Sequence, residues 1–351
     1  MNSKLLFACF ATSDIYARET GISMIGFFEN NPDYSPDEFF ILDYDILPEN
    51  KENLNSIAAQ YSKRITYLPA KDILEKIQLK LNLKDFRGSL ATYSRAFIDK
   101  IMPDYVERLL YIDSDTVVVS SISELKYFDM KDKCITACVS EKASNAIKNG
   151  QLALYSHNSR YYGCGIVLFD LIKWKEYDCF SKIAKMLETK KHYPCADQTL
   201  INNSLPENYF CKLPRKYNYI THLYSIPLEQ KMLNEGGWNT QDEIEEAIKK
   251  PVIIHYPGNN KGRPWFVNCT SRRKEEYFRY KSISPWKNDP LSDSKTFSKS
   301  FQIRFGAFIH SLEVKSNWFW LLQVINTLRF YLGPFFRRIE LLPSLPPEGI
   351  E

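Results

Sequence analysis

The chain has 351 residues, of which 44% are hydrophobic and 25% charged, the composition of an ordinary soluble globular protein with room for one large α/β domain. Its net charge of only +4 gives no reason to expect nucleic acid as a partner, and no uninterrupted run of about 18 apolar residues indicates a spanning helix. The eight cysteines form no CxxC pair and no metal-finger spacing, which indicates buried, reduced thiols of a cytosolic protein.

Apolar runs alternate with helix-like patterns from the start of the chain. The run after Lys4 resembles a short signal peptide, but Asp14 and a helical pattern follow at once, so we expect a buried first strand. The expected strands are residues 4–10, 38–42, 64–68, 108–112, 134–139, 162–169 and 252–255. The expected helices are residues 18–29, 50–61, 88–100, 172–189 and 196–204. This alternation predicts an α/β fold whose mainly parallel sheet is covered by helices on both faces.

Two acidic residues follow the strand expected at residues 108–112. Asp113 and Asp115 stand two positions apart, and on an extended backbone such residues point to the same side, roughly 6–7 Å apart. Two carboxylates facing one way repel each other unless a cation lies between them, and their oxygens suit Mg²⁺ or Mn²⁺. The alternative is an Asx-turn that closes the strand, because Asp and Ser favour turns.

The same string also fits the haloacid-dehalogenase-type phosphatases, in which Asp113 would be the nucleophile and Asp115 the acid/base. Such phosphatases usually carry this motif near the start of the domain and a paired-Asp metal site downstream. The sequence offers no convincing downstream pair. An Asp-nucleophile phosphatase is therefore the less favoured alternative.

A histidine at the end of a later apolar run supplies a third candidate ligand. His255 is followed by Gly258 and by two cations, Lys261 and Arg263. A lone strand-end histidine is more often structural than a metal ligand. A glycine-containing loop with two cations, however, is what a pyrophosphate needs, because it places positive charge near the leaving group.

The order of these motifs resembles glycosyltransferase family 8, the group that contains bacterial lipopolysaccharide galactosyl- and glucosyltransferases and glycogenin. The resemblance covers roughly residues 4–270. It includes residues 93–95, the Asp-x-Asp motif, residues 165–171, the Asp197-Gln198 pair and the His-x-x-Gly-x-x-Lys loop. It implies a GT-A fold, which is one Rossmann-like nucleotide-binding domain continuous with the acceptor face.

The resemblance also implies a reaction and a role for each candidate residue. The enzyme would move a hexose, galactose or glucose, from a UDP-sugar to a hydroxyl of a cell-surface saccharide, with retention of anomeric configuration. Asp113, Asp115 and His255 would bind Mn²⁺ or Mg²⁺. Asp197 would bind sugar hydroxyls and Gln198 would lie near the anomeric carbon. The donor would be bound by Ala11, Thr12, Tyr16, Arg95, Ser114, Gly258, Lys261 and Arg263.

Three departures from the family pattern concern the base and sugar ends of the site. Ser13 replaces an acid and Ile15 replaces an Asn in the string that contacts uridine, and Gly163 removes an amide from the sugar pocket. In addition, Arg263 holds the place directly before Pro-Trp that the family gives to Lys. These changes leave the metal ligands intact and prompt a second alternative, a non-catalytic homologue that binds a nucleotide sugar or glycan.

The C-terminal part of the chain differs in composition from the rest. We expect a catalytic domain over residues 1–281, a linker over 282–299 and a basic, aromatic, amphipathic tail over 300–351. Residues 295–338 contain seven cations and one acid. An apolar helix face with Trp and flanking cations suits an anionic membrane surface, so we expect peripheral attachment to the inner face of the cell membrane. The alternatives are a helix docked on the catalytic domain or a homodimer contact.

Overall fold

The computed structural model describes residues 5–85, 89–150, 152, 154, 156–189, 196–224, 237–258 and 260–293. The chain forms two compact units, Met1–Leu291 and Ser292–Glu351. The tail expected over residues 300–351 lies outside the described residues, as does the expected linker from residue 294 onward. All helices and strands that the structure describes lie in the first unit.

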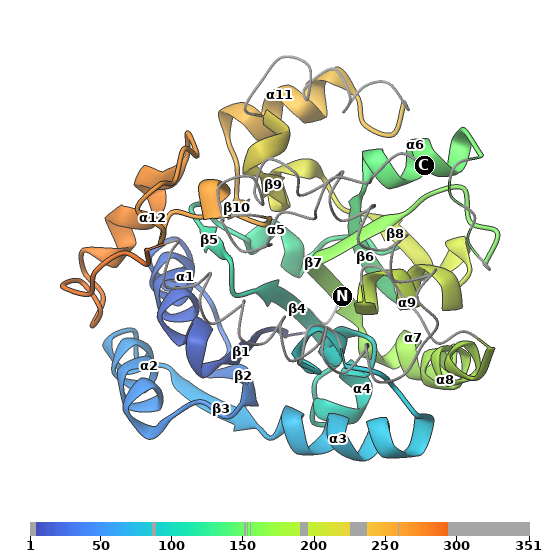
Figure 1. The fold of residues 1–351 in the computed structure, drawn as a ribbon, viewed down its shortest axis with the longest axis horizontal. Helices are drawn as coiled ribbons and strands as arrows, with labels where there is room; N and C mark the ends of the chain where they lie inside the picture. Colours follow the sequence, from blue (N-terminus) through green and yellow to red (C-terminus); the bar gives the residue numbers. More distant parts are fainter. Residues whose placement is uncertain are drawn as a thin grey trace, which may run out of the picture. The chain divides into compact units, whose positions relative to one another are not determined.

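A seven-stranded sheet with the order β3-β2-β1-β4-β7-β6-β8 forms the centre of the first unit (Figure 1). Four neighbouring strands run parallel, and they are β3 (Arg64–Leu68), β2 (Glu38–Tyr44), β1 (Leu6–Ser13) and β4 (Arg108–Asp113). The antiparallel strand β7 (Tyr162–Asp170) lies between β4 and β6 (Ile135–Val139), and β8 (Phe210–Lys212) runs parallel to β6. Because β7 runs in the opposite direction, it begins at the edge where β4 ends.

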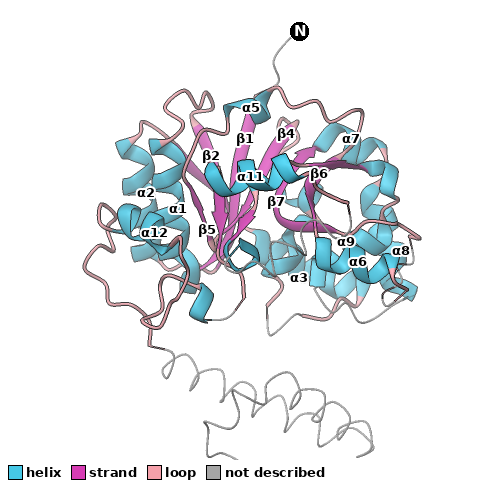
Figure 2. Ribbon diagram, turned by 90° about the horizontal axis from the view of Figure 1, so that it is seen from above, coloured by secondary structure: helices cyan, strands magenta, loops and turns pink. Residues whose placement is uncertain are grey.

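Alternate side chains of the strands enter two separate cores, as the two-residue period of a pleated strand requires. In β1, Ala8 and Phe10 enter one core and Phe7 and Cys9 the other. The first core contains α1 (Ala17–Glu29), α2 (Pro48–Gln60) and α12 (Lys274–Lys281). The second contains α3 (Ala70–Leu81), α7 (Leu171–Glu176), α8 (Cys179–Thr189) and α9 (Ala196–Ser204). Figure 2 shows α1, α2 and α12 on one side of the strands and α3, α8 and α9 on the other.

A small second sheet has the order β5-β10-β9 and begins directly after Asp115. β5 (Thr116–Val118) pairs antiparallel with β10 (Ile253–His255), which pairs parallel with β9 (Tyr219–Ile220). Among the described residues, the remaining α-helices are short, namely α4 (Ile98–Ile101), α5 (Ser123–Lys126), α6 (Glu141–Lys148) and α11 (Gln241–Lys249). The 3-10 helices are η1 (Asp14–Tyr16), η2 (Ala91–Arg95), η3 (Glu207–Tyr209), η4 (Arg215–Tyr217), η5 (Thr221–Tyr224) and η6 (Asn260–Gly262).

The seven predicted strands are present within a few residues of their expected ends, but two predicted helices are wrong in form. The helix expected over residues 88–100 is η2 followed by the four-residue α4. Within it, Ser94 Oγ donates to the Ala91 carbonyl at 2.6 Å, a side-chain bond that competes with regular helix geometry. The helix expected over residues 172–189 breaks into α7 and α8 at Asp178, which has a φ of +49°.

Residues after α12 pack against α1 and the end of α12. Trp286 lies against Gly21 of α1, where an added Cβ would come within 2.3 Å of the indole ring. The Lys281 ammonium donates to the carbonyls of Trp286, Lys287 and Asp289 at 2.8–3.1 Å. The first unit therefore continues through the residues expected to begin the linker. Among the residues described, no helix combines the length and apolarity that crossing a membrane requires.

Candidate metal and donor-binding site

The Asp-x-Asp turn connects β4 to β5 and is fixed by its own hydroxyl groups. β1 pairs with β4 so that Ala11 stands opposite Asp113. Ser114 Oγ donates to the Ala11 carbonyl at 2.8 Å and accepts from Thr20 Oγ1 at 2.9 Å. Thr116 Oγ1 donates to the Asp113 carbonyl at 2.8 Å. These bonds stabilise the turn. The Ser114 side chain points into the protein and links the turn to β1 and α1.

His255 lies beside the two carboxylates because β10 pairs with β5, which directly follows Asp115. The Nε2 atom of His255 is 3.0 Å from Asp115 Oδ1, and the Asp115 carbonyl accepts from the Tyr256 backbone N–H at 2.9 Å. One ligand atom from each of Asp113, Asp115 and His255 lies within 4.8 Å of the other two. Two carboxylate oxygens and an imidazole nitrogen converging in this way fit a divalent cation such as Mn²⁺.

Gly165 of β7 permits this approach. A Cβ at that position would lie 2.4 Å from His255 Cε1, 2.9 Å from His255 Nδ1 and 3.1 Å from Asp113 Oδ2. Real Cβ contacts are rarely this short, so only glycine lets β7 pass directly beneath the cluster. Sequence reasoning placed Gly165 in a family motif but could not supply this reason, which depends on a neighbour 90 residues away.

A buried arginine joins the carboxylate of Asp113 to the acid of α9. Arg95 Nη1 lies 3.0 Å from both oxygens of Asp113. Its Nε and Nη2 atoms donate to the two oxygens of Asp197 at 2.5 and 3.0 Å. Nη1 also donates to the Cys164 carbonyl at 2.5 Å. Arg95 therefore sets the relative position of Asp113, Asp197 and the start of β7.

Gln198 lies next to Asp197 in the first turn of α9, at the edge where β7 begins. Its Oε1 accepts from the Cys164 backbone N–H at 3.0 Å, and its side chain is partly exposed. Asn202, one turn later, exchanges hydrogen bonds with the Tyr162 backbone N–H and carbonyl at 2.7 and 2.9 Å. The orientation of Gln198 is thus fixed by the β7 backbone.

The charges of the cluster shift the pKa values of its members in opposite directions. Burial raises the pKa of Asp113 above its ordinary value, although Arg95 opposes the rise. Burial acts likewise on Asp115, but His255 and Arg263 outweigh it and hold the pKa of Asp115 below its ordinary value. Burial raises the pKa of Asp197 to about 6 against the opposing effect of Arg95.

The pKa of His255 is raised, because Asp115 and Asp113 outweigh burial, which alone would lower it. Without a cation, the raised pKa favours the protonated ring of His255 beside the Asp115 carboxylate. A cation that binds the imidazole must displace its proton.

The loop after β10 brings one of its two cations to the carboxylates. Gly258 has a φ of +100°, a conformation that favours glycine. Arg263 Nη2 lies 3.7 Å from Asp115 Oδ2, and its Nη1 donates to the Tyr16 hydroxyl at 3.3 Å. Lys261 is exposed in η6, and its carbonyl accepts from the Thr270 backbone N–H at 2.8 Å. Arg263 thus connects the metal-site carboxylate to the residue that ends η1.

The end of β1 is held by hydrogen bonds of Thr12 and Asp14. Thr12 is buried and its Oγ1 lies 2.8 Å from Thr20 Oγ1, so its hydroxyl faces the protein. Asp14, which sequence reasoning did not select, accepts at Oδ1 from the Leu47 N–H at 2.9 Å and from Asn50 Nδ2 at 2.8 Å. Asp14 therefore fastens η1 to the start of α2.

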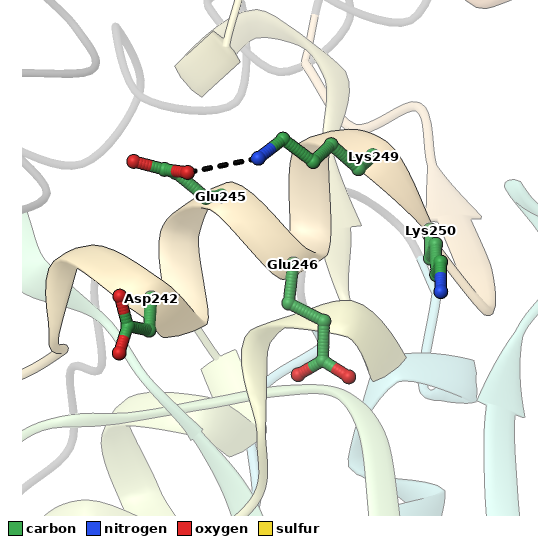
Figure 3. A pocket seen from close by; sticks show the side chains of 5 residues that line it. All are labelled: Asp242, Glu245, Glu246, Lys249 and Lys250. Carbon is green, nitrogen blue, oxygen red and sulfur yellow. Dashed lines mark hydrogen bonds and ion pairs between the residues drawn. The ribbon is translucent and has the colours of Figure 1, made fainter.

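A hollow of about 320 Å³ lies apart from this cluster, on the surface of α11 (Figure 3). Glu245 and Lys249 form an ion pair across it at 2.9 Å. Its lining residues are Asp242, Glu245, Glu246, Lys249 and Lys250. They are the solvated face of one helix and include none of the candidate site residues.

Comparison with known proteins gives consistent matches. The family model described as Glycosyl transferase family 8 matches residues 8–269. The chain is 30% identical over 215 residues to lipopolysaccharide 1,2-glucosyltransferase of Escherichia coli (strain K12), a match that covers 59% of each protein. It is 24% identical over 275 residues to lipopolysaccharide 1,3-galactosyltransferase of Salmonella typhimurium, covering 74% of this chain and 72% of the relative.

A solved structure supports the same fold. The galactosyltransferase LgtC, determined in complex with donor and acceptor sugar analogues, superposes with a TM-score of 0.62 at 19% identity. The match covers 79% of this chain and 96% of that one. The predicted α/β fold of the GT-A type is thereby confirmed.

Proposed function

Since the chain belongs to glycosyltransferase family 8, we propose that it transfers a hexose, galactose or glucose, from a UDP-sugar to a hydroxyl of a cell-surface saccharide with retention of configuration. The observation that carries the proposal is the convergence of Asp113, Asp115 and His255 within 4.8 Å at the edge where β4 ends and β7 begins. The names of the two lipopolysaccharide glycosyltransferases support the choice of sugar and acceptor class.

The three converging residues would hold Mn²⁺, or Mg²⁺ in its place. When bound, the cation supplies positive charge that neutralises the diphosphate of the donor. The two carboxylates alone would repel a diphosphate, so they need this cation and the nearby guanidinium of Arg263. The contact of Arg263 with Asp115 at 3.7 Å favours this residue as the leaving-group cation, with Lys261 as its partner in the same loop.

The residues around Asp197 would bind the sugar. Arg95 holds both oxygens of buried Asp197, which fixes the orientation of this carboxylate at the start of α9. Gln198, fixed by the Cys164 N–H, would face the anomeric carbon. As the bond from this carbon to the diphosphate breaks, an oxocarbenium-like sugar forms and UDP departs. An acceptor hydroxyl then attacks from the same face, and its proton passes to the departing diphosphate oxygen. Gly258, Tyr16, Ala11, Thr12 and Ser114 would complete the donor site through backbone and ring contacts.

A second candidate function is binding of a nucleotide sugar or glycan without turnover. Ile15 favours it, because this residue is 68% exposed in η1 where the family has an amide that contacts the base. We further propose that residues 300–351 attach the enzyme to an anionic membrane, where a lipid-linked saccharide would present its growing end. The seven cations in residues 295–338 support this part of the proposal.

A Mn²⁺-dependent assay of sugar transfer and donor hydrolysis tests the proposal with the Asp115→Asn variant. We expect the rate to fall at least about a hundredfold, because the substitution removes charge from the centre of the cluster. Asp104→Asn is the matched control, since Asp104 is 97% exposed and pairs with Lys175 on the surface. Near-normal activity in Asp115→Asn would overturn the assignment, and donor binding without turnover in the wild-type protein would favour the second candidate.

A further inference from the structure

His255 has a buried partner at each of its two ring nitrogens. The Nε2 atom faces Asp115 Oδ1 at 3.0 Å, within the proposed metal site. The Nδ1 atom faces Asn218 Oδ1 at 2.9 Å, on the side away from the carboxylates. Asn218 is 2% exposed and His255 is 6% exposed. The partners of the two ring nitrogens are therefore protein side chains, Asp115 at Nε2 and Asn218 at Nδ1.

The position of Asn218 is determined by backbone pairing on both of its sides. Its N–H donates to the Arg215 carbonyl at 3.0 Å, which closes η4. The next residue, Tyr219, opens β9, whose register with β10 places Tyr219 opposite Ile254 and Ile220 opposite His255. The N–H of Val252 also donates to the Lys216 carbonyl at 2.7 Å. These bonds carry the Asn218 side chain to the His255 ring.

The orientation of the Asn218 amide determines the tautomer. An amide oxygen only accepts, so Oδ1 facing Nδ1 requires a hydrogen on Nδ1. In the absence of a cation, the hydrogen on Nε2 is shared with Asp115, and a divalent cation displaces this hydrogen. The neutral imidazole that remains keeps its hydrogen on Nδ1 and presents the Nε2 lone pair to the cation. With the amide reversed, the NH₂ group would donate to Nδ1, the hydrogen would move to Nε2, and the imidazole would be closed to a cation.

We propose that Asn218 is a positioning residue that fixes His255 in the Nδ1–H tautomer, so that Nε2 is available to the divalent cation. This inference rests on the metal site of the proposed function. It assigns a role to a side chain outside the Asp-x-Asp and His-x-x-Gly motifs.

Mn²⁺ affinity of the full chain, measured by titration calorimetry at one mildly alkaline pH, tests the role. Asn218→Leu has a similar shape but no acceptor, and we expect it to weaken Mn²⁺ binding about 10- to 100-fold. Asn218→Asp keeps an acceptor, and we expect it to stay within a few-fold of wild type. In His255→Ala the effect of Asn218→Leu should disappear, because the asparagine acts through the ring.

The tautomer is also directly observable in the wild-type protein, without any variant. The ring ¹⁵N shifts of His255 with diamagnetic Mg²⁺ should show a hydrogen on Nδ1 and none on Nε2. The chain has five histidines, so comparison with His255→Ala identifies the signals. A hydrogen on Nε2, or losses of affinity that add up in the double variant, would overturn the role of Asn218.

The outcome with His255→Ala separates this inference from the proposed function. If His255→Ala binds Mn²⁺ as wild type does, the proposed metal site is wrong and the role of Asn218 is refuted with it. If His255→Ala loses affinity while Asn218→Leu does not, the metal site stands and only the role of Asn218 is refuted.

Discussion

Replacing Gly165 by alanine should damage the metal site without removing any ligand. The new Cβ would lie 2.4 Å from His255 Cε1 and 3.1 Å from Asp113 Oδ2. An ordinary contact needs about 3.4 Å or more, so the ring must retreat by about 1 Å. It cannot do so freely, because both of its nitrogens are hydrogen-bonded and the ring is buried.

Two effects follow in Gly165→Ala. Metal ligands tolerate displacements of only about 0.2 Å, so we expect Mn²⁺ affinity to fall at least about tenfold. Overpacking should lower the free energy of unfolding by about 1–3 kcal/mol, a few degrees in Tm. Calorimetric titration with Mn²⁺ and thermal unfolding of the metal-free protein measure the two effects separately.

Gly163, two residues earlier on β7, provides a matched control. A Cβ there would meet nothing closer than the Cys138 carbonyl at 3.7 Å and Gln198 Oε1 at 3.9 Å. Gly163→Ala should therefore leave Mn²⁺ affinity and Tm close to wild type. If the two variants bind Mn²⁺ equally well, the close approach of β7 to His255 does not control the site, and the reasoning is refuted.

Two further predictions concern pH and the buried arginine. The pKa of His255 lies above its ordinary 6.5, so its charged pair with Asp115 should stabilise the metal-free protein fully below that value and lose this contribution as pH rises through the raised pKa. Mn²⁺ must displace the same proton, so the affinity for Mn²⁺ should rise with pH over that range. If neither Mn²⁺ affinity nor the free energy of unfolding changes with pH, His255 and Asp115 do not form this pair. Arg95→Met should lower the free energy of unfolding by about 3–5 kcal/mol, because Asp113 and Asp197 lose their shared cation. The exposed pair of Arg64 is the control, since Arg64→Met should change the free energy of unfolding by less than about 1 kcal/mol, and equal losses in chemical denaturation would show that the Arg95 bridge adds nothing.

The main sheet and the Asp-x-Asp motif were predictable because they depend on local patterns. Each predicted strand of the main sheet is rich in apolar residues, and the Asp-x-Asp motif directly follows one of these strands. The pairing of β10 with β5 then brings His255 to Asp115 across 140 residues. This distance in sequence was bridged by the family resemblance, since no local pattern links the two residues.

Other features depend on neighbours that no short pattern reveals. Helix α3 is an exception, because it was missed although the spacing of its buried residues Ala70 and Leu74 is a local helical pattern. Asn218 belongs to no regular element, and only the parallel pairing of β9 with β10 gives it a partner. The clash that makes Gly165 necessary comes from a side chain on another sheet. Predicting such residues requires the register of strands far apart in the chain.

The parts of the site come from nearly the whole length of the first unit. Ser114 is hydrogen-bonded to the Ala11 carbonyl, Arg95 pairs with Asp197, and His255 contacts Asp115. Unfolding of any one of these segments would separate the ligands. Mn²⁺ binding should therefore report the cooperative folding of the whole unit. By mass action, a cation at about 100 times its Kd would add about 2.7 kcal/mol to the free energy of unfolding. Depletion of the metal would then expose the protein to proteolysis as well as silence it.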